Sequence, residues 1–505
     1  MPSYDAIIIG AGTNGLACAG KLAASGRKVL VIEAGASSGG GANTVEFAPG
    51  FRVSGLAHLY QGLDPRVVSG MKLDVGNFAQ AIATTALSAT GDHLTIQSAS
   101  LSGGPDAAAY LALHKRLTAF ANVLAPFCGL TPPRIAKGVG NDYLRLAKLG
   151  LGLRMLGKEE FREFLRMILI NVADVLEDDL TDDRLKGALA FDATLGAWLG
   201  PRSPNSLILL LNRLSMGAAI TMPKGGMGAV GAAMEQAVTR AGGVVRLNGA
   251  VARIIIDNDR AVGVALASGA EARAPIIISA INPRTTFQKL VGPQHLDAGF
   301  YKRTHHIRSR GGAAKLHLAL KGTPHFRGAD FKSRLVIAPS IRAVEDSFNA
   351  VKYGEVPLQP VLEAILPSAH EPGFAPDGCH TLSAIVQFAP HAPKDGHAAA
   401  RAQMLENSLA VLETYAPGIR GMMIHSELLM PYDIEARYGM VGGNWHHGEL
   451  AVEQMLFLRP LPEAAQYSTP LPGLWLAGAG NHPGGGITGA AGWNAAERIL
   501  REDGK

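Results

Sequence analysis

Cysteine is scarce in this sequence of 505 residues: Cys18, Cys128 and Cys379 lie far apart, with no CxxC pair and no spacing typical of a zinc site. Disulphide exchange requires two neighbouring thiols, so dithiol chemistry is not expected. So few thiols favour a reduced, cytoplasmic protein without a metal centre.

Long apolar runs and a strong net charge are also missing. The most apolar stretches, residues 207–211 and 167–176, are bounded or interrupted by polar residues well before the ~20 residues that a membrane span requires. The N-terminal residues lead directly into an apolar strand, so we expect no signal peptide. Because a formal charge of +5 is small for this length, nucleic acid is not expected as a partner.

The composition that is present is that of a globular protein with many tight turns. Hydrophobic residues make up 47% of the chain, charged residues 18%, and there are 61 glycines. A chain of this length exceeds one ordinary hydrophobic core, so we expect roughly two or three domains, which suits a cofactor domain and a substrate domain.

A GxGxxG motif, Gly10, Gly12 and Gly15, follows the first predicted strand (5–9) and opens the first predicted helix (16–25). Gly10 makes the tight turn, Gly12 lets the backbone approach a pyrophosphate, and Gly15 lets the helix pack on the strand. Glu33 ends the next strand, where a carboxylate accepts hydrogen bonds from the ribose hydroxyls of the adenosine. This succession of a strand, a glycine turn, a helix and a second strand that ends in an acidic residue predicts a Rossmann-type dinucleotide site.

A second GxGxxG, at Gly226, Gly228 and Gly231, lacks a preceding buried strand and an acid at the matching distance. We interpret it as a turn that opens a helix. A dedicated second dinucleotide site is therefore not expected.

Two further glycine turns favour FAD over NAD. Gly39 and Gly40 follow Glu33 and can pass under a pyrophosphate and a ribityl chain. In residues 473–500 a strand leads through a long glycine turn to a helix expected to begin near Ile487. Backbone amides there can hold the pyrimidine carbonyl of a flavin and stabilise its reduced form. An ordinary strand-to-helix turn is the alternative.

The segments that join these motifs predict a discontinuous domain. Alternating residues at 81–97 predict antiparallel strands with a turn at Gly91 and Asp92, whereas residues 106–217 have helical spacing. The predicted fold class is α/β, with α+β in the second domain. The cofactor domain would comprise residues 1–80, 221–300 and 441–505, and a substrate domain with a mixed sheet and a largely helical insertion would comprise residues 81–220 and 301–440.

The same segments resemble the FAD-dependent phytoene dehydrogenase-related family over nearly the whole chain, and within it the branch of pyridine nucleotide-disulphide oxidoreductase domain-containing protein 2 and the ketolase-type carotenoid enzymes. The resemblance is carried by IIIGAGTNGLACAGKLAASGRKVLVIEA, GGGANT, PKGGMGAVGAAM, SAINPRTTF, GNWHHGELAVEQMLFLRPLP and LPGLWLAGAGNHPGGGITGAAGWNAA. It implies FAD, a Rossmann-type domain, and a second domain that covers a lipophilic tunnel. No cysteine follows Cys379, so the flavin is expected to be non-covalent.

The motifs and the resemblance together predict the residues that hold the cofactor; among them, Val251 would lie against the adenine by its match to the family. The predicted cofactor residues are Gly10, Gly12, Thr13, Asn14, Gly15, Glu33, Ala34, Gly40, Gly41, Thr44, Val251, Gly480, Gly486, Ile487 and Thr488. Two positions depart from many relatives: Gly41 stands where they have Arg, and Ala479 where they have Asp. Both departures remove polar contacts to the flavin.

Three residues are candidates for chemistry near the flavin. Lys315 is similar in context to the lysine that sits near flavin N5 through a water in amine-oxidase relatives; the alternative is a surface lysine on a strand. His447, in the GNWHH block, and His482, in the last glycine turn, can shape the substrate end or donate to a carbonyl. A structural role is the alternative for both histidines, and His58 is open to the same two interpretations.

A basic, leucine-rich stretch at residues 134–158 offers a further expectation. Its cations are Arg134, Lys137, Arg145, Lys148, Arg154 and Lys158. Such a helix can lie on an anionic membrane surface and receive a lipid-soluble substrate, although a solvated face is the usual outcome.

Three functions remain open from the sequence. The first is an FAD oxidoreductase that acts on a hydrophobic, isoprenoid-like or carotenoid-like substrate by hydride transfer to flavin N5, with oxygen or a quinone as electron acceptor. The second is an amine or amino-acid oxidase on the same scaffold, and the third is an FAD-binding regulatory protein with little turnover.

Overall fold

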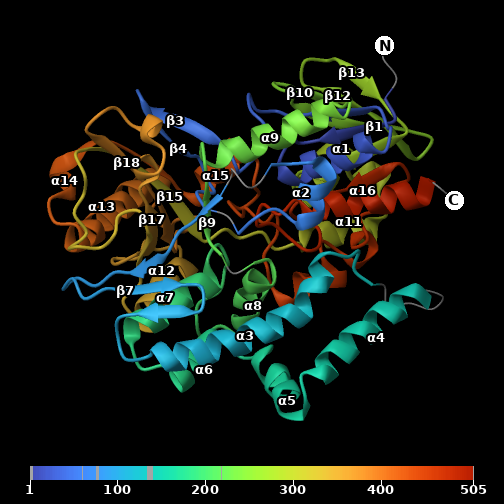
Figure 1. Ribbon diagram of the computed structural model, residues 1–505. Coiled ribbons are helices and arrows are strands. Elements are labelled where there is room, and N and C mark those ends of the chain that lie inside the picture. Colours follow the sequence, from blue (N-terminus) through green and yellow to red (C-terminus); the bar gives the residue numbers. More distant parts are fainter. Residues whose placement is uncertain (1–3, 60, 75–78, 134–139, 218, 504–505) are drawn as a thin grey trace.

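A five-stranded parallel sheet lies near both termini of the chain (Figure 1). The computed structural model describes residues 4–59, 61–74, 79–133, 140–217 and 219–503. The sheet has the order β10-β2-β1-β14-β20 and consists of β1 (Ala6–Ile9), β2 (Val29–Ile32), β10 (Val244–Arg246), β14 (Ile276–Ser279) and β20 (Leu474–Leu476). Its strands come from distant parts of the sequence, so the predicted discontinuous Rossmann-type domain is confirmed.

Both faces of this sheet are buried, which explains why its strands are continuous apolar runs. Ile8 packs into a core with four helices, whereas Ile7 and Ile9 pack into a second core on the opposite face. The four helices are α1 (Thr13–Ala24), α2 (Pro65–Met71), α9 (Met227–Arg240) and α16 (Ala490–Asp503). The second core includes an antiparallel sheet of β11 (Val251–Asp257), β12 (Arg260–Leu266) and β13 (Glu271–Arg273), with α10 (Pro283–Thr285) and α11 (Ala298–His305) nearby.

An eight-stranded mixed sheet forms the second half of the molecule, in the order β19-β15-β18-β17-β16-β6-β7-β8. Its strands are β6 (Thr84–Ala86), β7 (Leu94–Gln97), β8 (Ser100–Ser102), β15 (Ala313–Lys321), β16 (Arg334–Ile337), β17 (Val361–Ile365), β18 (Cys379–Gln387) and β19 (Met423–Leu429). Only β16 and β6 pair in parallel among these described strands. β6 and β7 form the antiparallel pair predicted around Gly91 and Asp92.

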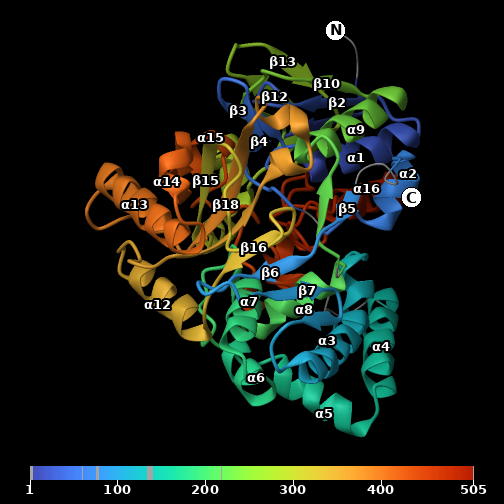
Figure 2. The same ribbon diagram turned by 60° about the vertical axis from the view of Figure 1, so that its left-hand side comes forward.

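A layer of helices lies beneath β6 and β7 (Figure 2). It comprises α3 (Ala107–Cys128), α4 (Gly140–Met155), α5 (Lys158–Met167), α6 (Val172–Asp179), α7 (Asp183–Thr194) and α8 (Leu207–Ser215). Phe120, Leu176 and Phe191 from this layer share one core with Ala86 and Leu94 of the strands above. The predicted helical insertion is therefore confirmed, and it covers one end of the mixed sheet.

The remaining elements connect or flank these layers. They are β3 (Thr44–Ala48), β4 (Phe51–Ser54), β5 (Ala79–Ala81), β9 (Thr221–Pro223), α12 (Ile341–Lys352), α13 (His397–Tyr415), α14 (Ile419–Met422) and α15 (Pro431–Tyr438). No helix in the described ranges is long and apolar enough to cross a membrane.

Helix boundaries differ from the sequence-based predictions at both glycine turns. α1 begins at Thr13, with Gly12 as its N-cap, so the last glycine of the motif lies inside the helix. α16 begins at Ala490 instead of near Ile487, because Ile487 and Gly489 have positive φ angles of 61° and 70° that a right-handed helix does not allow. The second GxGxxG opens α9 with Gly226 as the N-cap, as predicted.

Candidate functional site

A cavity of about 910 Å³ joins the two halves of the molecule. One end is lined by the phosphate turn, by residues 39–43 and by residues 485–487; the other is lined by the mixed sheet and the helical layer. Of the predicted cofactor residues, the cavity is lined by Gly10, Gly12, Thr13, Asn14, Glu33, Ala34, Gly40, Gly41, Val251, Gly486 and Ile487. This volume lies in the range of ligand and cofactor sites.

The glycines of the phosphate turn have separate structural tasks. Gly10 has a φ of +98°, which only glycine adopts without strain. A Cβ atom on Gly15 would lie 2.0 Å from the carbonyl oxygen of Gly10, so this position allows the close approach of helix and strand. A Cβ atom on Gly12 would meet no atom within 4 Å, because Gly12 faces the open cavity. The turn thus has room for a pyrophosphate over Gly12.

Glu33 connects this turn to the loop that follows β2. Its Oε2 accepts a hydrogen bond from Ala11 N at 2.7 Å, and its Oε1 accepts one from Gly35 N at 2.8 Å. Glu33 lines the cavity, and each carboxylate oxygen has capacity for a further hydrogen bond. A contact with the ribose stays a prediction.

Four predicted cofactor residues do not line the cavity. Gly15 packs against Gly10, and the Oγ1 atom of Thr44 accepts a hydrogen bond from Gly228 N at 3.1 Å. Gly480 packs so closely that a Cβ atom would lie 2.5 Å from Pro283, and Thr488 Oγ1 accepts from Ala490 N at 3.3 Å. These residues shape the loops, and direct contact with the cofactor stays a prediction.

A buried guanidinium, that of Arg459, lies behind the wall of the cavity. It donates hydrogen bonds to the backbone carbonyls of His446 (2.7 Å) and Ala479 (2.9 Å), both of which line the cavity. Burial lowers the pKa of Arg459 to about 10, so it stays charged at neutral pH. A positive charge there favours an anionic group in the cavity.

Lys315 is buried, so the alternative of a surface lysine is wrong. β15 lies between β18 and β19, and its residues from Ala313 to Leu320 are buried. The Nζ atom of Lys315 lies 2.7 Å from His58 Nδ1, and His58 lines the cavity although Lys315 does not. Burial lowers the pKa of Lys315 well below its usual value.

His58 is held between Lys315 and a carboxylate. Its Nε2 lies 3.1 Å from Glu363 Oε1, so the neutral ring donates from Nε2 and accepts at Nδ1. Burial, and then the charge of Lys315, lower the pKa of His58 to about 4. Burial opposes ionisation of Glu363, but Arg334 and His58 hold its pKa below the usual value.

This polar wall continues to the helical layer. Arg334 donates to Glu363 and, from Nη1, to Asp192 Oδ2 at 3.2 Å. Asp192 in turn faces Arg213, whose Nη1 donates to the backbone oxygen of Asp192 at 2.8 Å. All four of these charged residues line the cavity. The cavity therefore has one charged wall whose cations and anions alternate.

The histidines of the last two loops occupy different places. His447 lines the cavity, and burial with nearby Arg459 lowers its pKa to about 4; its Nδ1 has no hydrogen-bond partner in the described structure. His446 also lines the cavity and accepts from Trp445 Nε1 at 3.0 Å. His482 lies behind the wall, where its Nε2 lies 2.6 Å from the carbonyl oxygen of Phe127. His482 thus connects the last glycine turn to α3.

The two departures from the family pattern change the wall in different ways. A Cβ atom on Gly41 would lie 3.2 Å from Met440 and 3.5 Å from Leu56, so this part of the wall is apolar. At Ala479 the backbone oxygen is bonded to Arg459. This loop therefore has the buried guanidinium of Arg459 next to its backbone, where many relatives have the carboxylate of an Asp side chain.

The residues of the charged wall are absent from the sites predicted from the sequence, although the sequence contains a signal for them. Glu363 lies inside the apolar strand β17, and Arg334 begins β16; a charge in a buried strand requires a buried partner. Asp192 and Arg213 interrupt apolar helices in the same way. No group of three potential metal ligands occurs among the residues that the structure describes.

Comparison with known proteins agrees with these features. Residues 15–366 match the family of flavin containing amine oxidoreductases. The chain is 29% identical to pyridine nucleotide-disulfide oxidoreductase domain-containing protein 2 of Rattus norvegicus, over 99% of this chain and 94% of the relative. It is 25% identical to a limonene dehydrogenase subunit of Castellaniella defragrans, over 99% of this chain and 95% of that relative. A phytoene desaturase (neurosporene-forming) of Cereibacter sphaeroides is 30% identical over 62% of this chain and 59% of its own.

Solved structures of amine oxidases share the fold. Putrescine oxidase bound to putrescine superposes with a TM-score of 0.62 at 16% identity, over 99% of both chains. Cyclohexylamine oxidase from Brevibacterium oxydans superposes with a TM-score of 0.59 at 17% identity, over 100% of both chains. The glycine turns, the space over Gly12 and the cavity fit FAD, and the resemblance predicted from the sequence is confirmed. The chain therefore belongs to the flavin-containing amine oxidoreductase family and is an FAD-dependent oxidoreductase.

Proposed function

We propose that this oxidoreductase acts on a hydrophobic, isoprenoid-like molecule. The observation that carries the proposal is that one continuous cavity joins the dinucleotide turns to an apolar wall. That wall consists of Leu56, Leu59, Leu195, Leu209, Met216, Ile220, Ile385, Met440 and Leu450. Bound FAD supplies the acceptor for a hydride from a substrate C–H bond, with oxygen or a quinone as the final electron acceptor. The limonene dehydrogenase and the phytoene desaturase among the relatives support an isoprenoid substrate.

The residues around the cavity have three tasks in this proposal. The apolar wall orients the substrate and excludes water, which strengthens electrostatic interactions inside the cavity. His58 presents an ionisable ring to the cavity, and Lys315 acts as a positioning residue behind it. Because Lys315 Nζ and His58 Nδ1 are 2.7 Å apart, the pair can hold one proton between these two atoms.

Substitution of Lys315 tests this pair. We expect Lys315→Met to retain FAD but to slow flavin reduction by substrate about 100-fold and to change its pH profile, because His58 Nδ1 loses its nearer partner and keeps only Ser383 Oγ at 3.3 Å. Stopped-flow absorbance at several pH values measures the effect. Lys321→Met, at the exposed end of the same strand, is the matched control and should react like the wild type. Equal rates and pH profiles for both variants would remove Lys315 from the mechanism.

Anaerobic mixing with candidate substrates distinguishes the proposed function from its rivals. The panel contains limonene, phytoene in detergent, putrescine and cyclohexylamine. We expect the isoprenoids to bleach the flavin and the amines to leave it oxidised. Faster bleaching by an amine would favour the amine-oxidase alternative, for which Trp445 and Tyr438 in the cavity wall are the supporting observation. Tight FAD binding with no bleaching by a wider set of lipids and amines would favour a regulatory role.

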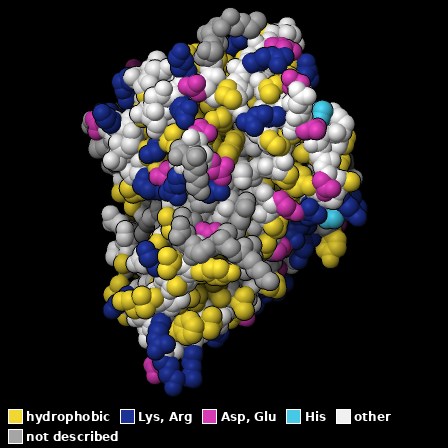
Figure 3. Space-filling model, turned by 90° about the vertical axis from the view of Figure 1, so that its right-hand side faces the viewer, with side chains coloured by type: hydrophobic (Ala, Val, Ile, Leu, Met, Phe, Trp, Pro, Cys, Tyr) yellow, Lys and Arg dark blue, Asp and Glu magenta, His cyan; other side chains and the backbone are white. Residues whose placement is uncertain are grey.

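We also propose that α4 and α5 contact an anionic membrane surface. Hydrophobic side chains gather on the lower part of the face in Figure 3, on the side where Figure 1 places α4 and α5, with basic side chains next to them. Leu144, Leu151 and Met155 are 58–79% exposed. Among the predicted cations, Arg134 and Lys137 lie outside the described residues, and the side chain of Arg145 is not described.

Sedimentation with vesicles tests this contact. We expect the protein to sediment with vesicles that contain phosphatidylserine, and a Leu151→Glu, Met155→Glu double variant to stay in the supernatant. Leu358→Glu, an 81% exposed leucine on another part of the surface, is the control and should sediment like the wild type. A wild-type protein that does not bind such vesicles contradicts the proposed contact.

A further inference from the structure

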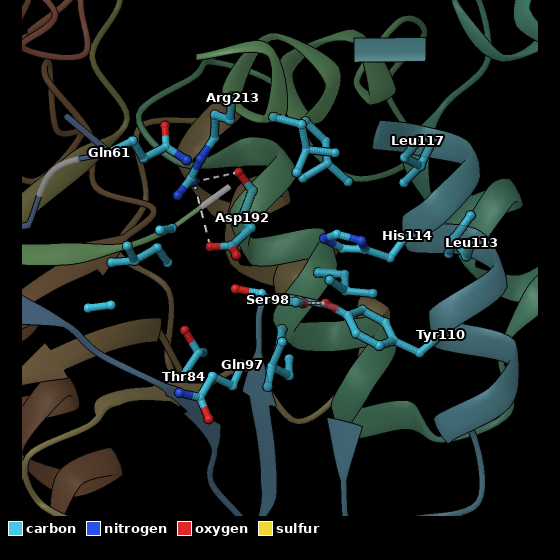
Figure 4. A pocket seen from close by; sticks show the side chains of 18 of the residues that line it. Gln61, Thr84, Gln97, Ser98, Tyr110, Leu113, His114, Leu117, Asp192 and Arg213 are labelled. Atoms are coloured by element: carbon cyan, nitrogen blue, oxygen red, sulfur yellow. Dashed lines mark hydrogen bonds and ion pairs between the residues drawn. The ribbon is translucent and has the colours of Figure 1, made fainter. Parts of the chain in front are cut away.

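A side pocket of about 150 Å³ adjoins the main cavity within the helical layer. It lies between α3, α7 and α8 and the strands β6 and β7 (Figure 4). Gln61, Asp192, Arg213 and Ile220 line both hollows, so they form the junction between them. A ligand that fills the main cavity can therefore extend past these four residues into the side pocket.

The side pocket is mainly apolar. Its apolar lining includes Leu113, Leu117, Leu189, Leu210 and Leu214. The hydroxyl of Tyr110 at its edge already donates to the carbonyl oxygen of Ser98 at 2.8 Å. An apolar protein cavity of about 150 Å³ accommodates benzene, so this pocket suits an apolar segment of roughly six carbons.

Arg213 presents hydrogen-bond donors at the junction. Its Nη1 donates to the backbone oxygen of Asp192, and the same atom lies 3.5 Å from Asp192 Oδ1 (Figure 4). Within the described structure, the Nε and Nη2 atoms of Arg213 make no hydrogen bond, and the side chain is 22% exposed. A guanidinium lacks acceptor capacity, so a ligand at this point must bring the acceptor.

The charges around Arg213 favour an uncharged acceptor. Asp192 is shared by Arg213 and Arg334, and Arg334 also binds Glu363, so two cations face two anions. The neighbouring Lys315 is buried against the neutral His58 and contributes no exposed cation to the junction. A carboxylate would thus be buried without a free cation to balance it, at a high desolvation cost.

We propose that the substrate carries a ketone or hydroxyl oxygen that accepts a hydrogen bond from Arg213, with an apolar end of about six carbons in the side pocket. This inference rests on the proposed function, since it places one end of the same hydrophobic substrate. Arg213 then makes an oxygenated chain bind more tightly than the matching hydrocarbon, which the apolar wall still accepts.

Binding of 2-alkanones of increasing length to the FAD-loaded protein tests the proposal. Calorimetry and the perturbation of the flavin absorbance report binding without turnover. We expect affinity to rise with chain length, and Arg213→Met to weaken ketone binding about 10- to 100-fold while binding of the matching alkanes is unchanged. Arg202→Met, an exposed arginine of the same layer that lines neither hollow, is the control and should bind like the wild type.

Filling the side pocket gives an independent readout. Leu189→Trp and Leu214→Trp are expected to abolish the gain in affinity from longer chains but to leave short ketones unaffected; thermal melting and the flavin spectrum verify that each variant is folded. Unchanged ketone affinity in Arg213→Met, tighter binding of fatty acids than of ketones, or a persistent gain from length in both folded Trp variants would overturn the proposal. If isoprenoids reduce the flavin in spite of such a result, only this inference fails; if no lipid reduces it, the proposed function itself fails.

Discussion

Lowering the pH from 7 to 4.5 is expected to unfold the cofactor-free protein, because buried histidines are uncharged in its folded state. Burial lowers the pKa to about 4 for His58, His447 and His482 and to about 3 for His446. In the unfolded chain these histidines have the unperturbed pKa of about 6.5. Between pH 6.5 and 4 the unfolded chain therefore binds more protons than the folded protein. The stabilisation by neutral histidine is complete above pH 6.5 and is lost as the pH falls through this window.

The expected magnitude is large. Each such histidine changes the free energy of unfolding by about 1.4 kcal/mol per pH unit in this window, so four together give about 5.5 kcal/mol per pH unit, against a total stability of about 5–15 kcal/mol. Urea unfolding at pH 7, 6 and 5 measures the slope. His482→Gln should lower the slope by about 1.4 kcal/mol per pH unit, whereas the exposed His306→Gln should leave it unchanged. Stability that stays level on acidification would contradict the burial of these neutral rings.

Substitution of two glycines in the same motif is expected to separate cofactor binding from folding. Gly12 has ordinary backbone angles (φ −67°, ψ 169°), and a Cβ atom there points into open cavity. Gly12→Ala should therefore keep the stability of the cofactor-free protein and weaken FAD binding about 10- to 100-fold, because the methyl group occupies the place of a phosphate contact.

Gly15→Ala is the opposite case. Its Cβ atom would lie 2.0 Å from the Gly10 carbonyl oxygen, so helix and strand must separate at a cost of about 3 kcal/mol. FAD titration and thermal melting of both variants provide the comparison. A destabilised Gly12→Ala protein, or one that binds FAD like the wild type, would show that the pyrophosphate does not lie over Gly12.

The phosphate turn was predictable from the sequence because its causes are local. Gly10, Gly12, Gly15 and Glu33 stand within one strand, turn, helix and strand unit. Neighbouring residues impose the steric demands that Gly10 and Gly15 meet, and Gly12 leaves the space above the turn open. The start of the last helix was predicted near Ile487, but α16 begins at Ala490. The pattern of apolar residues contains no signal for the positive φ angle of Ile487.

The charged wall was not predictable in the same way. Asp192, Arg213, Arg334 and Glu363 come from four separate helices and strands and meet only when the helical layer covers the end of the mixed sheet. Lys315 illustrates the same limit. Its alternating neighbours predict a strand with one exposed face, but tertiary packing covers both faces of that strand.

The visible absorption spectrum of the purified protein, with chromatography of the cofactor released on denaturation, tests the central claim that the glycine turns hold FAD at the cavity. The account predicts the bands of an oxidised flavin and release of intact FAD from the wild type, and loss of both from Gly12→Ala at low FAD concentration. A colourless protein that cannot be reconstituted with FAD would contradict it.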